Sequence, residues 1–233
     1  MEQIVNLSVR EANDMNAYVI IPEGDGPFPG VILFQEAFGV NAHIRDVAGR
    51  IAALGYVVIA PELFHRTAPA GWETGYDDFS LVMPHFSPLT ADAIENDAWA
   101  AYEWLLGSEK VIKDKIGCIG FCLGGRAAFI ANSGLPLTAA ISYYGGYTHP
   151  LADRAVNLHG PHLFFWGGKD NHITEEHVNT VIDAVRNAGK EYINVVISYA
   201  PHAFHCDARA SYHAQAASEA WGVTVAFLKN KLG

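Results

Sequence analysis

The sequence has little cysteine, little positive charge and no long apolar run. Its 233 residues include three cysteines, too few for a paired disulfide framework, so a reducing compartment is expected. Fifteen basic residues stand against 25 acidic ones, and the formal net charge of -10 argues against nonspecific binding to nucleic acid or to an anionic membrane. No segment has the length of a membrane span, and the N-terminus lacks the basic and apolar regions of a signal peptide. We therefore expect a cytoplasmic protein whose partner is a small molecule.

The apolar residues, by contrast, are plentiful and follow a regular order. They make up 50% of the chain, enough for one substantial core, so we expect a single domain over residues 1–233. Segments 3–9 and 16–21 predict an antiparallel hairpin, because a polar turn joins them. Later strands are predicted at 31–34, 56–60, 115–121, 139–145, 162–167 and 192–198. Helical patterns alternate with them, around 44–54, 90–105, 124–133, 174–188 and 211–231. This order predicts an α/β fold with a mainly parallel, doubly wound sheet of about eight strands and helices on both faces.

Residues 62–90 interrupt this alternation after a predicted strand. The segment is long, aromatic and rich in glycine and proline. Long loops in compact domains are usually functional or disordered, and the aromatic residues argue against disorder. We expect a lid or pocket wall, with a plain packed excursion as the alternative. Together with Tyr144, the following side chains could line a hydrophobic pocket, although such residues often simply pack: Trp72, Tyr76, Phe79, Met83 and Phe86.

Two of the three cysteines lie within IGCIGFCLGG, residues 116–125. A predicted strand runs into the turn around Cys122 and then directly into a helical pattern. This context is typical of a nucleophile elbow, with cysteine where serine is usual. A thiol at a helix N-terminus is favoured as thiolate. Cys122 is therefore the candidate nucleophile, with a buried structural thiol as the alternative, and Cys118 is assigned to the core.

An acid and a histidine should follow such a nucleophile in chain order, each beyond a later strand. Asp170 follows the strand HLFFWG, and His202 follows the strand YINVVIS. His205 is a second candidate for the base. Asp170 could instead cap the helix that begins near Thr174, although Thr174 is the better cap. The order Cys122, Asp170, His202 predicts a catalytic triad.

The motifs GFCLGG, WGGKDNHIT and SYAPHAFHCDARASYH resemble the dienelactone hydrolase family of the α/β-hydrolase superfamily, and the resemblance spans nearly the whole chain. It implies hydrolysis of a carboxylic ester or lactone through an acyl thioester, with Cys122 attacking, His202 as base and Asp170 orienting the imidazole. No cofactor is expected. The 11 histidines show no metal-ligand spacing, so no metal site is expected either.

The resemblance also assigns the surroundings of the nucleophile. It implies that Glu36, in FQEAFG, contacts the resting cysteine and helps to form the thiolate. The backbone amides of Leu123 and Ala37 are the expected oxyanion donors. The predicted substrate-binding side chains are Phe38, Tyr76, Tyr144 and Arg209.

One departure from the family's pattern concerns the substrate. Members that act on dienelactone carry an arginine a few residues past the catalytic histidine and another in the long loop. Here Cys206 lies four residues past His202, and residues 67–90 contain no arginine or lysine. Arg209 and Arg66 are the remaining candidates for binding a substrate carboxylate.

Other functions stay open at this point. A general carboxylesterase acting on neutral hydrophobic esters would use the same chemistry. A thiol redox protein using Cys118 and Cys122 is a weaker alternative, because about 13 Å along an extended strand would separate them. A non-catalytic ligand-binding relative is a third. A monomer or a small homo-oligomer is expected.

Overall fold

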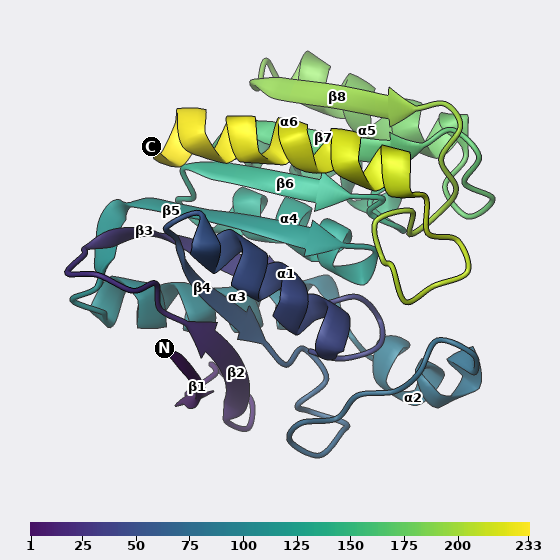
Figure 1. The fold of residues 1–233 in the computed structure, drawn as a ribbon. Coiled ribbons are helices and arrows are strands. Elements are labelled where there is room, and N and C mark those ends of the chain that lie inside the picture. Colours follow the sequence, from purple (N-terminus) through teal and green to yellow (C-terminus); the bar gives the residue numbers. More distant parts are fainter.

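The computed structural model describes residues 1–233 and has one sheet of eight strands between two layers of helices (Figure 1). The strands are β1 (Glu2–Leu7), β2 (Met15–Ile20), β3 (Phe28–Phe34), β4 (Val57–Pro61), β5 (Val111–Phe121), β6 (Ala139–Tyr143), β7 (His162–Gly167) and β8 (Tyr192–Ile197). The helices are α1 (Ala42–Ala53), α2 (Met83–Phe86), α3 (Ala91–Gly107), α4 (Leu123–Gly134), α5 (Glu175–Asn187) and α6 (Ala214–Leu232), with 3-10 helices η1 (Phe79–Leu81) and η2 (His149–Asn157). Every predicted strand and helix is present.

The strands lie in the order β1-β2-β4-β3-β5-β6-β7-β8. β1 and β2 pair antiparallel, as the predicted hairpin requires, and β2 pairs antiparallel with β4. The strands from β3 to β8 are mutually parallel. Since parallel strands point the same way, the loops that follow β3, β5, β7 and β8 meet at one edge of the sheet. This edge is where the candidate site residues lie.

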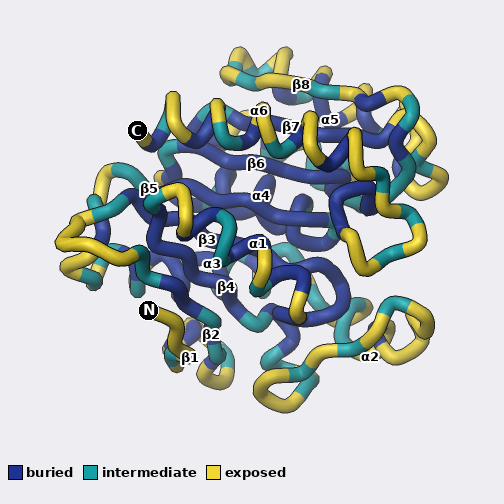
Figure 2. Tube along the Cα trace, viewed as in Figure 1, coloured by how far each residue is buried: buried dark blue, intermediate teal, exposed yellow.

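Helices cover both faces of the sheet, α1 and α6 in front and α3, α4 and α5 behind in the view of Figure 1. The inner strands are buried on both faces, as Figure 2 shows, and every residue of β4, β6 and β7 is buried. Their continuous apolar runs are therefore those of a sheet covered on both sides, as predicted. The core consists of two clusters of 39 and 31 buried residues.

Side-chain caps define where several helices begin. The hydroxyl oxygen of Thr90 accepts a hydrogen bond from the backbone of Ala93 at the start of α3. Thr174 caps α5 in the same way, which leaves Asp170 free for another role. Gly55 follows α1 with a φ of +93°, a left-handed conformation that glycine adopts without strain.

Segment 62–90 contains two short helices, η1 and α2, where the sequence predicted only a lid or wall. Its outer side chains are well exposed: Phe79 by 46%, Leu81 by 54% and Met83 by 43%. Only Val82 is fully buried between residues 65 and 90. The segment is thus a structured but shallowly packed excursion from the sheet edge.

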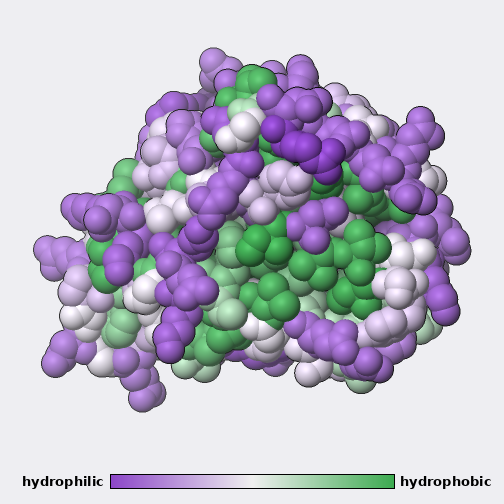
Figure 3. Space-filling view, turned by 90° about the horizontal axis from the view of Figure 1, so that it is seen from above, coloured by the Kyte–Doolittle hydropathy of each residue, from purple (hydrophilic) through white to green (hydrophobic).

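Apolar side chains are also exposed on β8, at one edge of the sheet. β8 is one of the two edge strands, and its Ile193 and Val196 are 44% and 53% exposed. β8 lies at the top of Figure 1, and apolar residues gather across the middle of the face seen from above in Figure 3. None of the helices combines the length and apolarity needed to cross a membrane.

Candidate active site

Cys122 lies on the sharp turn between β5 and α4. Its φ of 54° and ψ of -110° are an unusual, strained backbone conformation for a residue with a side chain. Its N–H donates to the carbonyl of Tyr143 on β6 at 3.0 Å. A Cβ on Gly120 would collide with the carbonyl of Gly124, and one on Gly124 would collide with that of Phe34. The two glycines therefore permit the close approach that raises the thiol above the sheet edge.

His202 and Asp170 meet this thiol from the loops after β8 and β7. Nε2 of His202 lies 3.3 Å from Sγ of Cys122, and Nδ1 lies 2.6 Å from Oδ2 of Asp170. The other oxygen of Asp170, Oδ1, accepts hydrogen bonds from the backbone of His172 at 2.7 Å and Ile173 at 3.0 Å. The structure thus brings together the three residues that chain order predicted, and each side chain has a defined partner.

The electrostatics of the three groups favour a charged imidazole. Burial opposes the charged form of His202, but the Cys122 thiolate and the hydrogen bond to Asp170 outweigh it and raise the pKa of His202 to about 10. Burial also opposes the ionised form of Asp170. Its hydrogen bonds from His202 and from two backbone amides nevertheless keep its pKa below the usual value. The arrangement favours the charged form of His202 beside an ionised Asp170.

Glu36 is fully buried at the end of β3, and neither of its oxygens has a hydrogen-bond partner. Its nearest cation is Arg209, with Nη1 at 3.9 Å from Oε1. Glu36 therefore makes no hydrogen bond to Cys122 in this structure. The reason is geometric, because the thiol is hydrogen bonded to His202 while the Glu36 carboxylate faces Arg209.

The two expected oxyanion donors have free N–H groups. Ala37 donates no backbone hydrogen bond. Leu123 is the first residue of α4, so its N–H has no acceptor within the helix. Gly124 packs against the carbonyls of Phe34 and Gln35, so the start of α4 and the end of β3 are in contact.

Phe38, Tyr76 and Arg209 form one cluster beside Glu36. The rings of Phe38 and Tyr76 are 4.7 Å apart in an edge-to-face arrangement, and the Arg209 guanidinium lies over both, at 5.3 Å and 5.7 Å. The hydroxyl of Tyr76 accepts hydrogen bonds from Asn41 at 2.9 Å and from the thiol of Cys206 at 3.4 Å. Segment 62–90 is thereby tied to the loop after β3 through Tyr76.

Tyr144 lies deeper than a pocket-lining residue would. It is fully buried, its hydroxyl has no hydrogen-bond partner, and its ring is 5.2 Å from that of His202. Burial raises its pKa well above the usual value, and the charges of Glu36, Cys206 and Cys122 add to this effect. The ring of Tyr144 packs against the His202 imidazole, and because it is fully buried it exposes no surface to a ligand.

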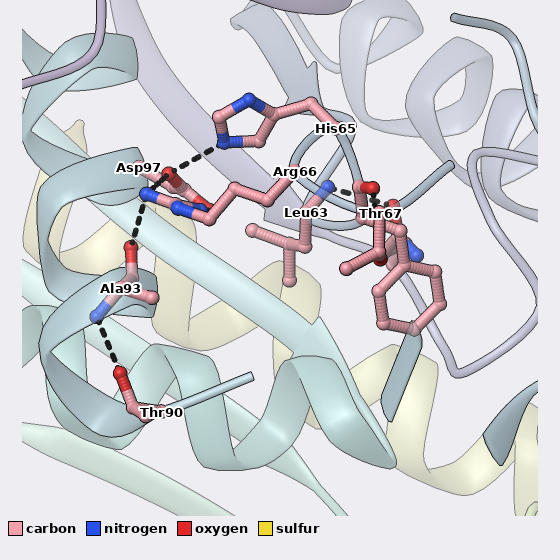
Figure 4. Close-up of polar contacts among 9 residues, drawn as sticks. Leu63, His65, Arg66, Thr67, Thr90, Ala93 and Asp97 are labelled. Atoms are coloured by element: carbon pink, nitrogen blue, oxygen red, sulfur yellow. Dashed lines mark hydrogen bonds and ion pairs between the residues drawn. The ribbon is translucent and has the colours of Figure 1, made fainter. Parts of the chain in front are cut away.

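Arg66, the second candidate for binding a substrate carboxylate, has a different partner. Its Nη1 and Nη2 pair with the two oxygens of Asp97 at 2.9 Å and 2.8 Å, and Nε2 of His65 lies 3.1 Å from Oδ1 (Figure 4). Asp97 is fully buried on α3. The suggestion for Arg66 is therefore wrong, because this guanidinium already neutralises a buried carboxylate.

The sequence reasoning missed one residue near the nucleophile, Arg126. It lies at the end of the first turn of α4. Burial lowers the pKa of its guanidinium, and the charge of Cys122 opposes this effect only in part. A signal was available, since Arg126 is the single charged residue in the helical pattern LGGRAAFIANSG.

The structure does not support a thiol redox function for Cys118 and Cys122, because Cys118 is not accessible. Cys118 is fully buried within β5 and donates to the carbonyl of Ala128 at 3.6 Å. Burial raises the pKa of this thiol, which leaves it unreactive. All three cysteines are free, and no group of three or more His, Cys, Asp or Glu side chains is arranged to hold a metal ion.

This sheet topology, with a cysteine on the sharp turn between the central strand β5 and the helix α4, is that of an α/β-hydrolase. Acylaminoacyl peptidase of Pyrococcus horikoshii shares the fold, with a TM-score of 0.76 at 14% identity over 100% of this chain and 42% of that one. The profile of the dienelactone hydrolase family matches residues 15–232. The chain belongs to the dienelactone hydrolase family.

Individual relatives agree with this. A Yersinia pestis protein named "Putative carboxymethylenebutenolidase" is 34% identical over 91% of this chain and 82% of its own. One of the same name from Escherichia coli K12 is 35% identical over 91% and 80%. The crystal structure of a Klebsiella pneumoniae protein named "Putative Dienelactone Hydrolase" has a TM-score of 0.87 at 32% identity, covering 98% of this chain and 99% of that one. The protein is a hydrolase of this family.

Proposed function

We propose that this protein hydrolyses carboxylic ester or lactone bonds in the manner of a carboxymethylenebutenolidase. Cys122 is the nucleophile, His202 carries the proton and Asp170 orients the imidazole. The observation that carries the proposal is the hydrogen-bonded series from Asp170 through His202 to the thiol, with distances of 2.6 Å and 3.3 Å. Such a series activates a thiol for attack on a carbonyl group.

In the acylation step the Cys122 thiolate attacks the carbonyl carbon, and a C–S bond forms. The carbonyl oxygen becomes an oxyanion, which accepts hydrogen bonds from the amides of Leu123 and Ala37. When this intermediate collapses, the C–O bond of the ester or lactone breaks. The His202 imidazolium donates its proton to the leaving oxygen, and an acyl thioester remains.

In the second step water attacks the thioester carbonyl while neutral His202 accepts its proton. The C–S bond breaks, the acid is released and the thiolate and imidazolium are restored. Asp170 holds the ring in place in both steps, because its Oδ2 accepts the Nδ1 proton and its Oδ1 is fixed by two backbone amides. Glu36 adds a second buried carboxylate, whose charge Arg209 offsets.

The rim of the site favours a second candidate substrate class. Phe79 and two further apolar side chains of segment 62–90, Leu81 and Met83, are between 43% and 54% exposed. The ring of Phe79 lies 6.1 Å from that of Phe38, next to the proposed oxyanion site. An apolar rim of this kind suits neutral hydrophobic esters, on which the same residues would act as a general carboxylesterase.

A panel of an aryl acetate, simple lactones and both dienelactone isomers tests the proposal, with wild type compared with Cys122→Ala. We expect the substitution to lower kcat by at least about 10⁴-fold on every substrate that wild type accepts. Cys118→Ala is the matched control, because it removes a buried thiol outside the site. Wild-type turnover by pure Cys122→Ala protein would rule out the mechanism, and turnover of neutral esters alone would select the second candidate.

A further inference from the structure

Arg126 differs from every other arginine in the chain. Seven of the eight lie within 4.0 Å of a carboxylate, namely Arg10, Arg45, Arg50, Arg66, Arg154, Arg186 and Arg209. Arg126 has no such partner. Its Nε and Nη2 atoms are buried and make no hydrogen bond. A guanidinium remains charged under all ordinary conditions, so Arg126 is a partly buried cation with no carboxylate partner.

The two unpartnered nitrogens form a specific edge of the guanidinium. The N–H bonds of Nε and Nη2 point in nearly the same direction, which is the geometry that binds both oxygens of one carboxylate. The structure therefore leaves unused the edge that gives arginine its preference for carboxylates.

Arg126 also lies beside the reacting thiol. Its backbone N–H donates to the carbonyl of Cys122 at 3.3 Å, one turn away on α4. Burial lowers the pKa of the guanidinium, and the charges of Cys122 and Tyr147 raise it. An anion bound to Arg126 would thus be held close to an ester carbonyl that the thiolate attacks.

An aromatic ring from segment 62–90 now covers this guanidinium. Phe86 of α2 lies with its ring centroid 5.2 Å from the Arg126 guanidinium carbon. The same ring contacts Phe79, at 6.2 Å between centroids, and Tyr147, at 6.3 Å. A cation–π contact partly replaces a counterion but offers no hydrogen-bond acceptor in the plane of the guanidinium. An anion entering this place would displace the ring, and α2 is a single turn with no buried residue.

Arg209, the arginine expected to bind a substrate carboxylate, already has a carboxylate partner. Its charge is offset by Glu36 at 3.9 Å, and its guanidinium lies over Phe38 and Tyr76. A second carboxylate at Arg209 would face the buried charge of Glu36, whereas one at Arg126 would face no acidic side chain within 4.0 Å.

We propose that Arg126 is a substrate-binding residue that holds a carboxylate of the ester or lactone through its Nε and Nη2 edge, with Phe86 moving aside. This inference rests on the proposed hydrolase function and names the residue of this chain that would bind a substrate carboxylate. It places the specificity-determining charge on α4, the helix that follows the proposed nucleophile.

Paired substrates test this assignment. The p-nitrophenyl hemiesters of succinic, glutaric and adipic acid are compared with p-nitrophenyl esters of uncharged acids of matched length. For Arg126→Met we expect the ratio of kcat/KM between the anionic and neutral esters to fall by about 10- to 100-fold. Arg126→Lys keeps the positive charge but lacks the two parallel N–H groups, so it should give an intermediate ratio. Arg186→Met, which removes an exposed arginine from α5, is the charge-matched control and should leave the ratio at the wild-type value.

Binding without turnover separates this proposal from the hydrolase mechanism. Calorimetric titration of Cys122→Ala protein with glutarate and with uncharged dimethyl glutarate should show tighter glutarate binding, and the added substitution Arg126→Met should abolish the difference. If wild type hydrolyses no ester, the mechanism fails while this titration still decides the anion site. An unchanged ratio, equal losses on both ester classes in folded Arg126→Met protein, or equal glutarate binding by both proteins would overturn the proposal.

Discussion

Two neighbouring regions differ in how tightly they are packed. One is the cluster of Cys122, His202 and Asp170 at the strand ends, and the other is segment 62–90. In the cluster, every side chain has a short hydrogen bond, and the side chains of His202 and Asp170 are only 13% and 1% exposed. In the segment, Phe79 is 46% exposed and α2 buries no residue. Shallow packing lets a segment open at low cost, while a hydrogen-bonded group on a sheet edge stays fixed. Under the proposed function, the cluster carries out the reaction, and segment 62–90 with the residues that it covers influences substrate choice.

Removing the negative charge within the cluster should have the largest effect. Asp170→Asn should lower kcat by about 10²- to 10⁴-fold, because the amide neither fixes the imidazole nor stabilises its charge. It should also move the alkaline limb of the pH–rate profile. The pKa of His202 is about 10, so the imidazolium is present below that pH and activity falls as pH rises through it. Without the Asp170 contribution this fall should begin at lower pH.

The measurement is kcat against pH from 6 to 11, with circular dichroism at each pH as a control for folding. Asp183→Asn serves as a matched variant, since Asp183 is an exposed carboxylate on α5 that pairs with Arg186. An alkaline limb at the same pH in wild type and Asp170→Asn would mean that His202 is not the titrating group.

A steric change at the elbow should have the next largest effect, this time on stability. Gly124→Ala would force a methyl group against the carbonyls of Phe34 and Gln35. Overpacking of this kind should lower the free energy of unfolding by about 1–3 kcal/mol and reduce activity by displacing α4 from β3. Denaturant unfolding measures the first effect.

Gly222→Ala is the matched control for that experiment. Gly222 lies within α6, and nothing lies within 4 Å of an added Cβ. The same substitution there should raise stability by about 0.5–1 kcal/mol, because alanine is the better helix former. Equal effects at the two positions would show that the elbow is no more tightly packed than an exposed helix.

The smallest effects are expected in segment 62–90. Tyr76→Phe removes the hydroxyl that accepts from Asn41 and Cys206 but keeps the ring against Phe38. Trp72→Ala removes a ring that lies 4.6 Å from His85. Each should change the relative kcat/KM values across an ester panel by about 3- to 10-fold, since a lost pocket contact is worth about 1 kcal/mol. Identical relative rates for wild type and both variants would remove the segment from substrate choice.

The success of the sequence reasoning was uneven for physical reasons. Strands and helices could be predicted because apolar periodicity and capping residues such as Thr90 and Thr174 act locally. Chain order together with strand ends was enough to bring Cys122, Asp170 and His202 to one edge, since parallel strands share a direction. Arg66 was misjudged because its partner, Asp97, is 31 residues away and buried on a helix. No local pattern reports such a pairing.

The sequence by itself therefore determined the sheet, its helices and the edge at which the reactive side chains meet, because these depend on periodicity and order along the chain. Tertiary structure alone decided which charges are compensated. Arg66 faces Asp97, Arg209 faces Glu36, and Arg126 lies against the ring of Phe86 with no carboxylate partner. The strength of a charge interaction depends on distance and burial in three dimensions, and residues far apart in sequence set both.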